Sequence, residues 1–255
     1  MATKETPKIT LHWLEKSRSQ RILWLLEELE VPYEIKTYKR EKTMLAPPEL
    51  KKVHPLGKSP TITIGDRAMA ESAFITEYLC EHFADPTSTL VPKKWKDGYE
   101  GQLEGETEEW MRYRYYMHYC EGSLMTLMTL AFIPWRIKRA PTPFFLRPIT
   151  SRIAAQFDSF SQPEFATHLG FLEEQLKTAP GGGPYLCGAH LTGADILMSY
   201  PLVNAQIPQD GHSPLNKKAY PKLWEYTELL KERPGSKRAI EKIIAIDGEY
   251  NPNFV

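Results

Sequence analysis

Hydrophobic and polar positions follow two different patterns along the chain, and the change divides it in two. Near the start, residues 8–14 ("KITLHWL") and 31–39 ("VPYEIKTYK") are short runs of β-forming residues. The run "RILWLLEELE" between them has apolar residues at helical spacing: Ile22, Leu25, Leu26 and Leu29. A strand, a helix and a strand within about thirty residues predict a βαβ unit with a parallel strand pair.

A hairpin and a second helix complete this first region. Residues 61–65 and 67–70 are short apolar runs that flank Gly65-Asp66, a dipeptide typical of hairpin turns. The run "ESAFITEYLCEHF" (71–83) then has helical spacing. Residues 84–94 contain two prolines and no helical period, which indicates a linker.

Beyond the linker, the periodic segments are helical and no strand pattern recurs. These segments are residues 97–133, 148–178, 193–206 and 219–245. We therefore predict an α/β domain followed by an all-α domain. The predicted boundaries are 1–84 for the first domain, 85–96 for the linker and 97–255 for the second domain.

Composition narrows the functional class. The chain has 255 residues, with 32 basic and 32 acidic side chains, and this balance argues against a general nucleic-acid-binding protein. No apolar run is long enough to span a bilayer, and the start "MATKETPKIT" lacks the apolar core of a secretory signal. The three cysteines are far apart, so neither disulfides nor a thiolate metal site is expected: Cys80, Cys120 and Cys187. We expect a cytoplasmic protein without a metal.

The stretch "HPLGKSPTI" (54–62) contains the Gly-Lys-Ser triplet of phosphate-binding loops. Such a loop needs a glycine five residues before Gly57, where this chain has Lys52, and it needs a helix after the triplet. Pro60 and a strand pattern follow instead, so nucleotide binding is excluded here. The Ser59–Pro60 bond is either a trans turn, the more frequent state, or a cis bond that leaves backbone groups of Ser59 for an extended peptide ligand.

The order of these elements resembles the cytosolic glutathione transferases. "HPLGKSPTI" is similar to the cis-proline turn of that family, with His54 in place of the usual Asn, and an E-S pair opens the next helix as it does there. "YLCGAHLTGADILMSYPL" (185–202) resembles the family's buried helix start, with Thr192 and Asp195 at capping-box spacing. The resemblance covers roughly residues 8–245 and implies a thioredoxin-like first domain, an all-α second domain and a homodimer.

The family's chemistry requires glutathione as a thiolate. A free thiol with a pKa of about 8.5 is only about 3% ionised at pH 7. A helix N-terminus and a hydrogen-bond donor lower the thiol pKa. The resemblance to serine-type members implies that Ser17, before the first helix, is the donor. Ser19 and a backbone N–H are alternative donors, and without the resemblance Ser17 or Ser19 is a plain helix cap.

Further residues match glutathione's charged groups. The resemblance implies that Ser72 and the amides of its helix start bind the γ-glutamyl carboxylate, and that Glu71 binds the ammonium group. The resemblance further implies that Lys58 pairs with the glycyl carboxylate and that the Ser59–Pro60 turn holds the peptide backbone. The structural alternatives are an N-cap for Ser72 and solvated surface charges for Glu71 and Lys58.

The electrophile pocket is expected between the domains. The segment 108–135 is rich in aromatic residues and methionine, which suits a broad apolar pocket, although most of these residues belong to the core. The candidates for its lining are Trp13, Tyr115, Tyr116 and Trp135.

The stretch 132–152 has an unusual composition. Between Glu121 and Asp158 there is no acidic residue, and aromatic and aliphatic side chains are interleaved with five basic ones: Arg136, Lys138, Arg139, Arg147 and Arg152. Contact with a membrane surface or an acidic substrate fits this pattern. We favour the simpler interpretation, a lengthened helix connection that covers the pocket and keeps its charges solvated.

The sequence therefore predicts a serine-type glutathione transferase that uses glutathione as co-substrate and conjugates it to small hydrophobic electrophiles, without a metal. Two alternatives use the same scaffold. One is a non-catalytic binding or regulatory protein, and the other is a glutathione peroxidase with the same site.

Overall fold

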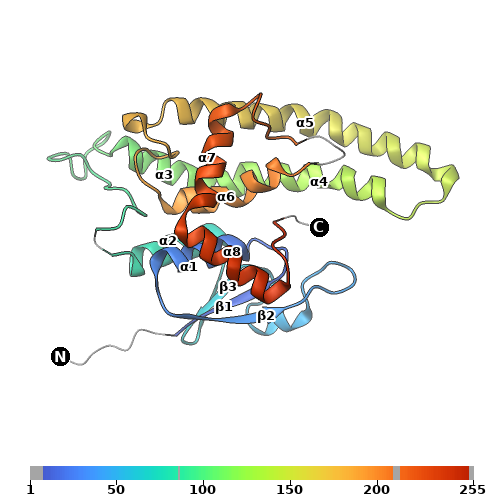
Figure 1. Cartoon of the computed structure of the whole chain (residues 1–255), viewed down its shortest axis with the longest axis horizontal. Coiled ribbons are helices and arrows are strands. Elements are labelled where there is room, and N and C mark those ends of the chain that lie inside the picture. The colour runs from blue at the N-terminus through green and yellow to red at the C-terminus, as the bar shows by residue number, and fades with distance from the viewer. Residues whose placement is uncertain (1–7, 86, 209–212, 253–255) are drawn as a thin grey trace.

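The computed structural model describes residues 8–85, 87–208 and 213–252. Figure 1 shows a sheet-containing domain below a longer layer of helices. The strand order is β2-β1-β3-β4. β1 is parallel to β2, and β3 is antiparallel to β1 and β4, so the predicted βαβ unit and hairpin are confirmed. The strands are β1 (Ile9–Leu14), β2 (Tyr33–Tyr38), β3 (Thr61–Ile64) and β4 (Arg67–Ala70).

Helices cover the sheet and form the second domain. The first domain contains α1 (Ser19–Leu29), α2 (Ser72–Phe83) and the 3₁₀ turn η1 (Pro48–Lys52). The second contains α3 (Glu108–Tyr119), α4 (Met125–Arg139), α5 (Arg147–Lys177), α6 (Gly193–Gln206), α7 (Pro221–Glu232) and α8 (Pro234–Asp247). Its short turns are η2 (Cys120–Leu124), η3 (Phe144–Leu146) and η4 (Pro180–Gly182). The predicted fold class, a thioredoxin-like α/β domain followed by an all-α domain, is confirmed.

The helix α1 is the element through which the two domains meet. It packs against β1 and α2 on its own domain and against α6 and α8 of the other. Every residue from Ser19 to Glu27 is consequently buried. The sequence pattern predicted only one apolar face, and the additional burial includes polar side chains at the start of the helix.

The first helix of the second domain begins later than predicted. The prediction of a helix from about residue 97 is wrong, because α3 starts at Glu108. Gly98 and Gly101 have φ values of 81° and 76°, which turn the chain and are incompatible with a right-handed helix. The first turn of α3 then donates a backbone N–H to the Thr107 hydroxyl, which caps the helix.

The start of α6 is fixed by a buried carboxylate. The predicted pairing of Thr192 with Asp195 is confirmed, since the Asp195 carboxylate accepts the Thr192 N–H at 2.8 Å. It also accepts hydrogen bonds from the Tyr226 hydroxyl at 2.7 Å and the Leu186 N–H at 3.2 Å. Burial raises the pKa of Asp195. These bonds hold α6 in the centre of the molecule, where it contacts α1, α2, α3 and α7.

The helices α4 and α5 form a long hairpin that extends beyond the first domain (Figure 1). They pack along each other, and η3 lies at their joined end. Within residues 8–85, 87–208 and 213–252, no helix combines the length and apolar character required to cross a membrane.

Candidate active site

Three serine hydroxyls meet at the N-terminus of α1. The Ser17 Oγ lies 3.0 Å from the Ser59 Oγ, and the Ser19 Oγ also forms a hydrogen bond with Ser59. Ser17 comes from the loop that enters α1 and Ser19 is the first residue of that helix, whereas Ser59 comes from the turn before β3. The Ser59–Pro60 bond is cis, as the family resemblance implied. The sequence therefore brings together residues 42 positions apart at the positive end of a helix dipole.

The hydroxyl of Ser17 has both of its hydrogen-bonding functions engaged. It donates to the Leu14 carbonyl at 2.7 Å and accepts the Ser19 N–H at 3.2 Å. The second bond is of the helix-capping kind, although the N-cap position itself is Arg18 and its side chain does not cap. Ser17 is 5% exposed and Ser19 is fully buried, whereas Ser59 is only partly buried. Polar groups thus line the helix start just below the protein surface.

The start of α2 also lies next to Arg21. Ser72 is the first residue of α2 rather than its N-cap, which is Glu71. The Glu71 side chain is exposed and does not cap the helix, and its backbone has a φ of 75°. Ser72 is buried and accepts a hydrogen bond from Arg21 Nη2 at 3.0 Å. This bond connects the beginnings of α1 and α2.

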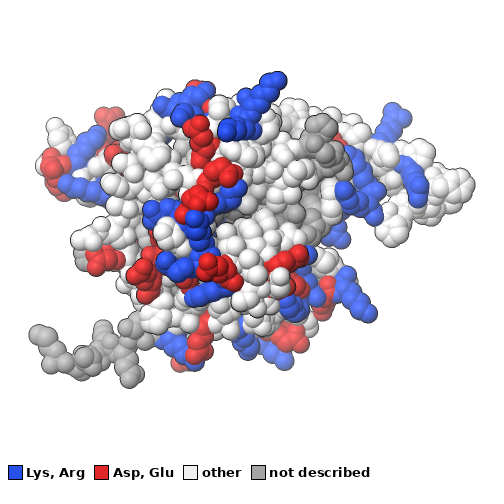
Figure 2. Space-filling model, in the orientation of Figure 1, with Lys and Arg blue, Asp and Glu red and all other residues white. Residues whose placement is uncertain are grey.

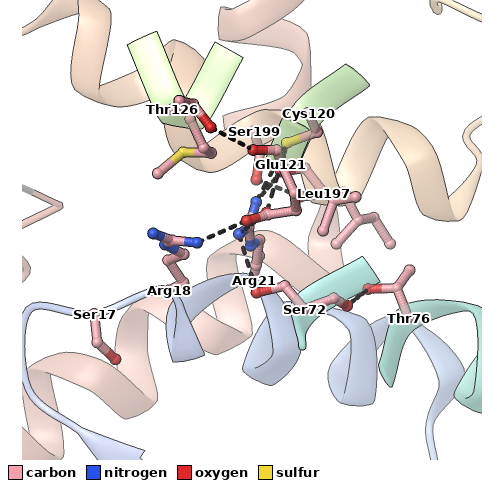
Figure 3. A network of polar contacts seen from close by, with 12 residues as sticks. Ser17, Arg18, Arg21, Ser72, Thr76, Cys120, Glu121, Thr126, Leu197 and Ser199 are labelled. Atoms are coloured by element: carbon pink, nitrogen blue, oxygen red, sulfur yellow. Dashed lines mark hydrogen bonds and ion pairs between the residues drawn. The ribbon is translucent and has the colours of Figure 1, made fainter. Parts of the chain in front are cut away.

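Arg21 is a fully buried guanidinium that joins the two domains (Figure 3). Its Nη2 also pairs with the Glu121 carboxylate, and its Nη1 donates to the Leu197 carbonyl at 2.8 Å. Leu197 lies in α6, four residues before Pro201, which has no N–H to donate to that carbonyl. Arg21 supplies the donor that the proline cannot, and this explains why a charged group is tolerated there.

Glu121 belongs to η2, a π-helical turn between α3 and α4. Its carboxylate binds Arg21 through one oxygen and Arg18 Nη1, at 2.7 Å, through the other. Figure 3 shows the carboxylate between the two guanidinium groups. Single π-turns within helices are frequent at functional sites, because the extra residue re-aims a side chain. Here η2 aims Glu121 at the N-terminal turn of α1.

Comparison with known proteins assigns the fold to a family. The pattern described as "Glutathione S-transferase, N-terminal domain" matches residues 17–82, and "Glutathione S-transferase, C-terminal domain" matches residues 153–229. Glutathione S-transferase 1 of Saccharomyces cerevisiae is 36% identical over 203 residues, which are 77% of this chain and 80% of the yeast protein. The chain belongs to the glutathione S-transferase family.

Solved structures of other glutathione transferases have the same fold. A glutathione S-transferase from Actinobacillus pleuropneumoniae has a TM-score of 0.64 and 29% identity, and the match covers 96% of this chain and 95% of that one. A glutathione transferase homologue from Sulfitobacter, solved with bound glutathione, has a TM-score of 0.66 and 17% identity, over 92% and 98% of the two chains. The predicted resemblance is confirmed, and the family supports glutathione transferase function for this protein.

The remaining predicted glutathione contacts lie around the serines. Lys58 is exposed, and its carbonyl accepts a hydrogen bond from the Thr61 hydroxyl at 2.8 Å. Pro60 is buried directly before β3. In the structure, Ser17, Ser59 and Pro60 therefore lie together near the N-terminus of α1, while Glu71 and Ser72 stand at the start of the neighbouring helix α2.

The four aromatic residues predicted for the electrophile pocket are not brought together. Trp13 is fully buried in β1, where its indole N–H donates to Asp247 at 3.0 Å. Tyr115 and Tyr116 touch edge to face on α3, but Tyr115 is half exposed and turns toward α5. Trp135 is partly buried on α4, about 28 Å further along the helical path from Tyr116 at 1.5 Å per residue. Ring contacts thus join Tyr115 to Tyr116 and to α5, whereas Trp13 and Trp135 belong to β1 and α4.

Sequence reasoning missed the three charged residues of the network, Arg18, Arg21 and Glu121. Two signals were available. Arg21 stands four residues before Leu25, on the apolar face of the predicted helix, where a charge needs a partner. Pro201 lies inside a predicted helix, so the carbonyl of Leu197 requires a donor from another element. Neither signal identifies Glu121, which reaches the site through the π-turn.

The cysteines take no part in this corner as thiolates. All three are buried, and burial raises the pKa of Cys80 and of Cys120 to about 12 and also raises that of Cys187. Cys120 Sγ accepts from Arg21 Nη1 at 3.4 Å and serves as a packed neutral group. Among the described residues, no cluster of three or more His, Cys, Asp or Glu side chains is arranged to hold a metal ion.

Proposed function

We propose that the protein binds glutathione across the starts of α1 and α2 and transfers it as a thiolate to small hydrophobic electrophiles. The observation that carries this proposal is the hydroxyl cluster at the N-terminus of α1, joined by Arg21 to the start of α2. A sulfur placed there faces the positive end of a helix and a set of O–H donors, and both favour the anion.

Ser17 is the donor to the sulfur in this mechanism. Its hydroxyl proton points to the Leu14 carbonyl, and on binding of glutathione it turns to the sulfur. The thiol proton passes to solvent, the thiolate electron pair forms a bond to the electrophilic carbon, and the leaving group departs with its own pair. Ser19 is the weaker candidate, because it is fully buried, whereas Ser17 keeps 5% of its surface exposed.

Arg21 orients Ser72 toward the γ-glutamyl carboxylate. A hydroxyl has one proton and two lone pairs, and here the Arg21 N–H occupies a lone pair. The Ser72 proton is then available to donate to the carboxylate, beside the first amides of α2. The exposed Glu71 carboxylate binds the ammonium group, and the exposed Lys58 binds the glycyl carboxylate.

The electrophile approaches from the side of η2 and the beginning of α4, in this proposal. The Glu121–Arg18 pair brings η2 to the N-terminal turn of α1, and the exposed Thr126 follows in α4, with its hydroxyl bonded to the Glu121 carbonyl. This side differs from the Tyr115–Tyr116 face predicted from sequence.

The homodimer remains a prediction from the family, and sedimentation velocity measures the oligomeric state.

The deciding experiment is the ultraviolet thiolate band of bound glutathione, recorded across pH. We expect the wild type to lower the thiol pKa by about two units from the free value of about 8.5. Ser17→Ala should abolish most of that shift, while Ser19→Ala, the matched control whose hydroxyl bonds to the same Ser59, should retain it. If Ser17→Ala binds glutathione and lowers its thiol pKa as much as the wild type does, Ser17 has only a capping role.

The same titration separates the alternatives. Binding of glutathione with an unshifted thiol pKa favours a non-catalytic binding protein. A shifted pKa with turnover of peroxides but not of carbon electrophiles favours a peroxidase. Absence of binding would contradict the proposed site altogether.

A further inference from the structure

The joined end of α4 and α5 presents apolar and cationic side chains together. Phe144 and Phe145 in η3 are 80% and 65% exposed and touch each other edge to face. On the first turns of α5, Ile149 and Ile153 are about half exposed. We define the arm tip as residues 136–160. It lies at the end of the hairpin that reaches beyond the first domain (Figure 1).

The exposed apolar residues of α5 share one helix face. At 3.6 residues per turn, four of them fall within a sector of about 80°. The buried Ala154 and Ser161 lie beside this sector, about 40–60° beyond Phe157, on the buried face of α5. The apolar face is therefore distinct from the buried face and open to solvent. Its members are Ile149, Ile153, Phe157 and Phe160.

Cations surround this apolar surface. The arm tip has five basic side chains, and its one acidic residue, Asp158, is paired with Lys138 at 2.8 Å. Figure 2 shows Lys and Arg over this end of the molecule, at the right of the view. A hollow of about 400 Å³ at the turn is lined by Lys138, Arg139 and Arg147 together with the hydroxyls of Thr142, Thr150 and Ser151. Cations and hydroxyl donors are the groups that bind phosphate.

We propose that the arm tip docks the protein on the surface of an anionic phospholipid bilayer. The cationic hollow receives lipid phosphates, and Phe144, Phe145 and Ile149 enter the interface between headgroups and acyl chains. Both attractions act at such a surface, because apolar insertion holds the protein in the interface and basic residues are attracted to the anionic lipid headgroups.

Charge makes a second copy of the chain the poorer occupant. In a two-fold symmetric contact, the same patch faces itself. The five cations of one tip would then oppose the five of the other, with one carboxylate on each side already paired. Like charges brought together across an interface cost free energy. An anionic bilayer instead complements the whole patch.

Vesicle flotation of the full chain tests this docking. We expect the wild type to bind vesicles of phosphatidylcholine with phosphatidylserine, to bind pure phosphatidylcholine weakly, and to lose binding as salt is raised. Arg147→Glu with Arg152→Glu should weaken binding at least about tenfold, and Phe144→Ser with Phe145→Ser by a similar factor. The matched controls are Leu103→Ser, which removes an apolar side chain that is 95% exposed, and Lys217→Glu with Lys218→Glu; both should bind like the wild type.

Three results would overturn the proposal. They are failure of the wild type to float with anionic vesicles, equal flotation of wild type and tip variants, and a change of oligomeric state in the Phe144–Phe145 variant, which identifies a subunit contact. Glutathione turnover, measured in solution for every variant, keeps this outcome separate from the proposed function. Turnover lost with flotation retained would instead make the arm tip a cover for the pocket.

Discussion

Arginine serves opposite purposes at the two ends of the α4–α5 hairpin. Near η2, Arg21 is fully buried, and its two terminal nitrogens bond to four groups, which come from α2, η2 and α6. At the arm tip, Arg147 and Arg152 are exposed and surrounded by exposed apolar side chains. The guanidinium that is buried must have partners within the protein, whereas the exposed ones are available to partners outside it. Burial thus distinguishes a residue that holds the site together from residues that contact a surface.

The largest effect should come from removing the buried guanidinium. Arg21→Met leaves the Leu197 carbonyl without its nitrogen donor, deprives Ser72 of a bond and removes one partner of Glu121. We expect the free energy of unfolding to fall by about 3 kcal/mol or more. Arg152→Met, the matched change at the arm tip, should alter it by no more than about 0.5 kcal/mol. Urea unfolding monitored by fluorescence measures both.

Glutathione affinity sharpens the same comparison. Because Arg21 orients Ser72 in the proposed site, Arg21→Met should weaken glutathione binding at least about tenfold even where the protein remains folded. Arg152→Met should bind glutathione normally. If urea unfolding gives Arg21→Met and Arg152→Met the same stability, the network that joins the two domains contributes little to the free energy of unfolding. The Leu197 carbonyl opposite Pro201 must then be satisfied in another way.

The two regions also differ in how far the sequence predicts them. Local patterns predicted β3 and β4 around Gly65-Asp66, the bounds of α6 and the Thr192–Asp195 pairing, since each depends on residues close in sequence. The Arg21 network depends on residues 51, 100 and 176 positions away, which no local pattern relates. Spacing alone does not identify Glu121, because it is the π-turn that directs its side chain.

At the arm tip the sequence predicted the composition but not the exposure. Ile149, Ile153 and Phe157 have the spacing of a core-facing helix, and that spacing would ordinarily place them against another element. Their exposure follows from the absence of a packed neighbour on that face among the described residues, while Ala154 and Ser161 on the adjoining face are buried. The periodicity identifies a face, and only the tertiary structure shows what covers it.

Acid should weaken the sheet beneath the site through His12. This imidazole is 5% exposed and bonds to the Tyr38 hydroxyl at 2.9 Å and the Thr63 hydroxyl at 3.2 Å. Burial, followed by the charge of Lys36, lowers the pKa of His12 below 6.5. The stability that the neutral form provides is therefore complete above the unfolded-state pKa and is lost as pH falls through the lower folded-state pKa.

Urea unfolding between about pH 7 and pH 5 measures this dependence, with a slope of at most about 1.4 kcal/mol per pH unit from one proton. His12→Gln should flatten the slope in that range. Phe144→Ser with Phe145→Ser should leave it unchanged, because the arm tip is remote from the sheet. A slope that survives in His12→Gln assigns the acid sensitivity to another group.

The smallest effect is expected for a phenylalanine at the exposed end of the hairpin. Phe145 is 65% exposed, whereas Phe165, twenty residues along the chain in α5, is 6% exposed within the core. Phe165→Ala should lower the free energy of unfolding by about 3 kcal/mol or more, because it creates a cavity. Phe145→Ala should change it by no more than about 0.5 kcal/mol, since water already reaches most of the ring. A large loss of stability in Phe145→Ala, measured by the same urea titration, would show that the ring packs within the protein and would remove it from the membrane-docking surface.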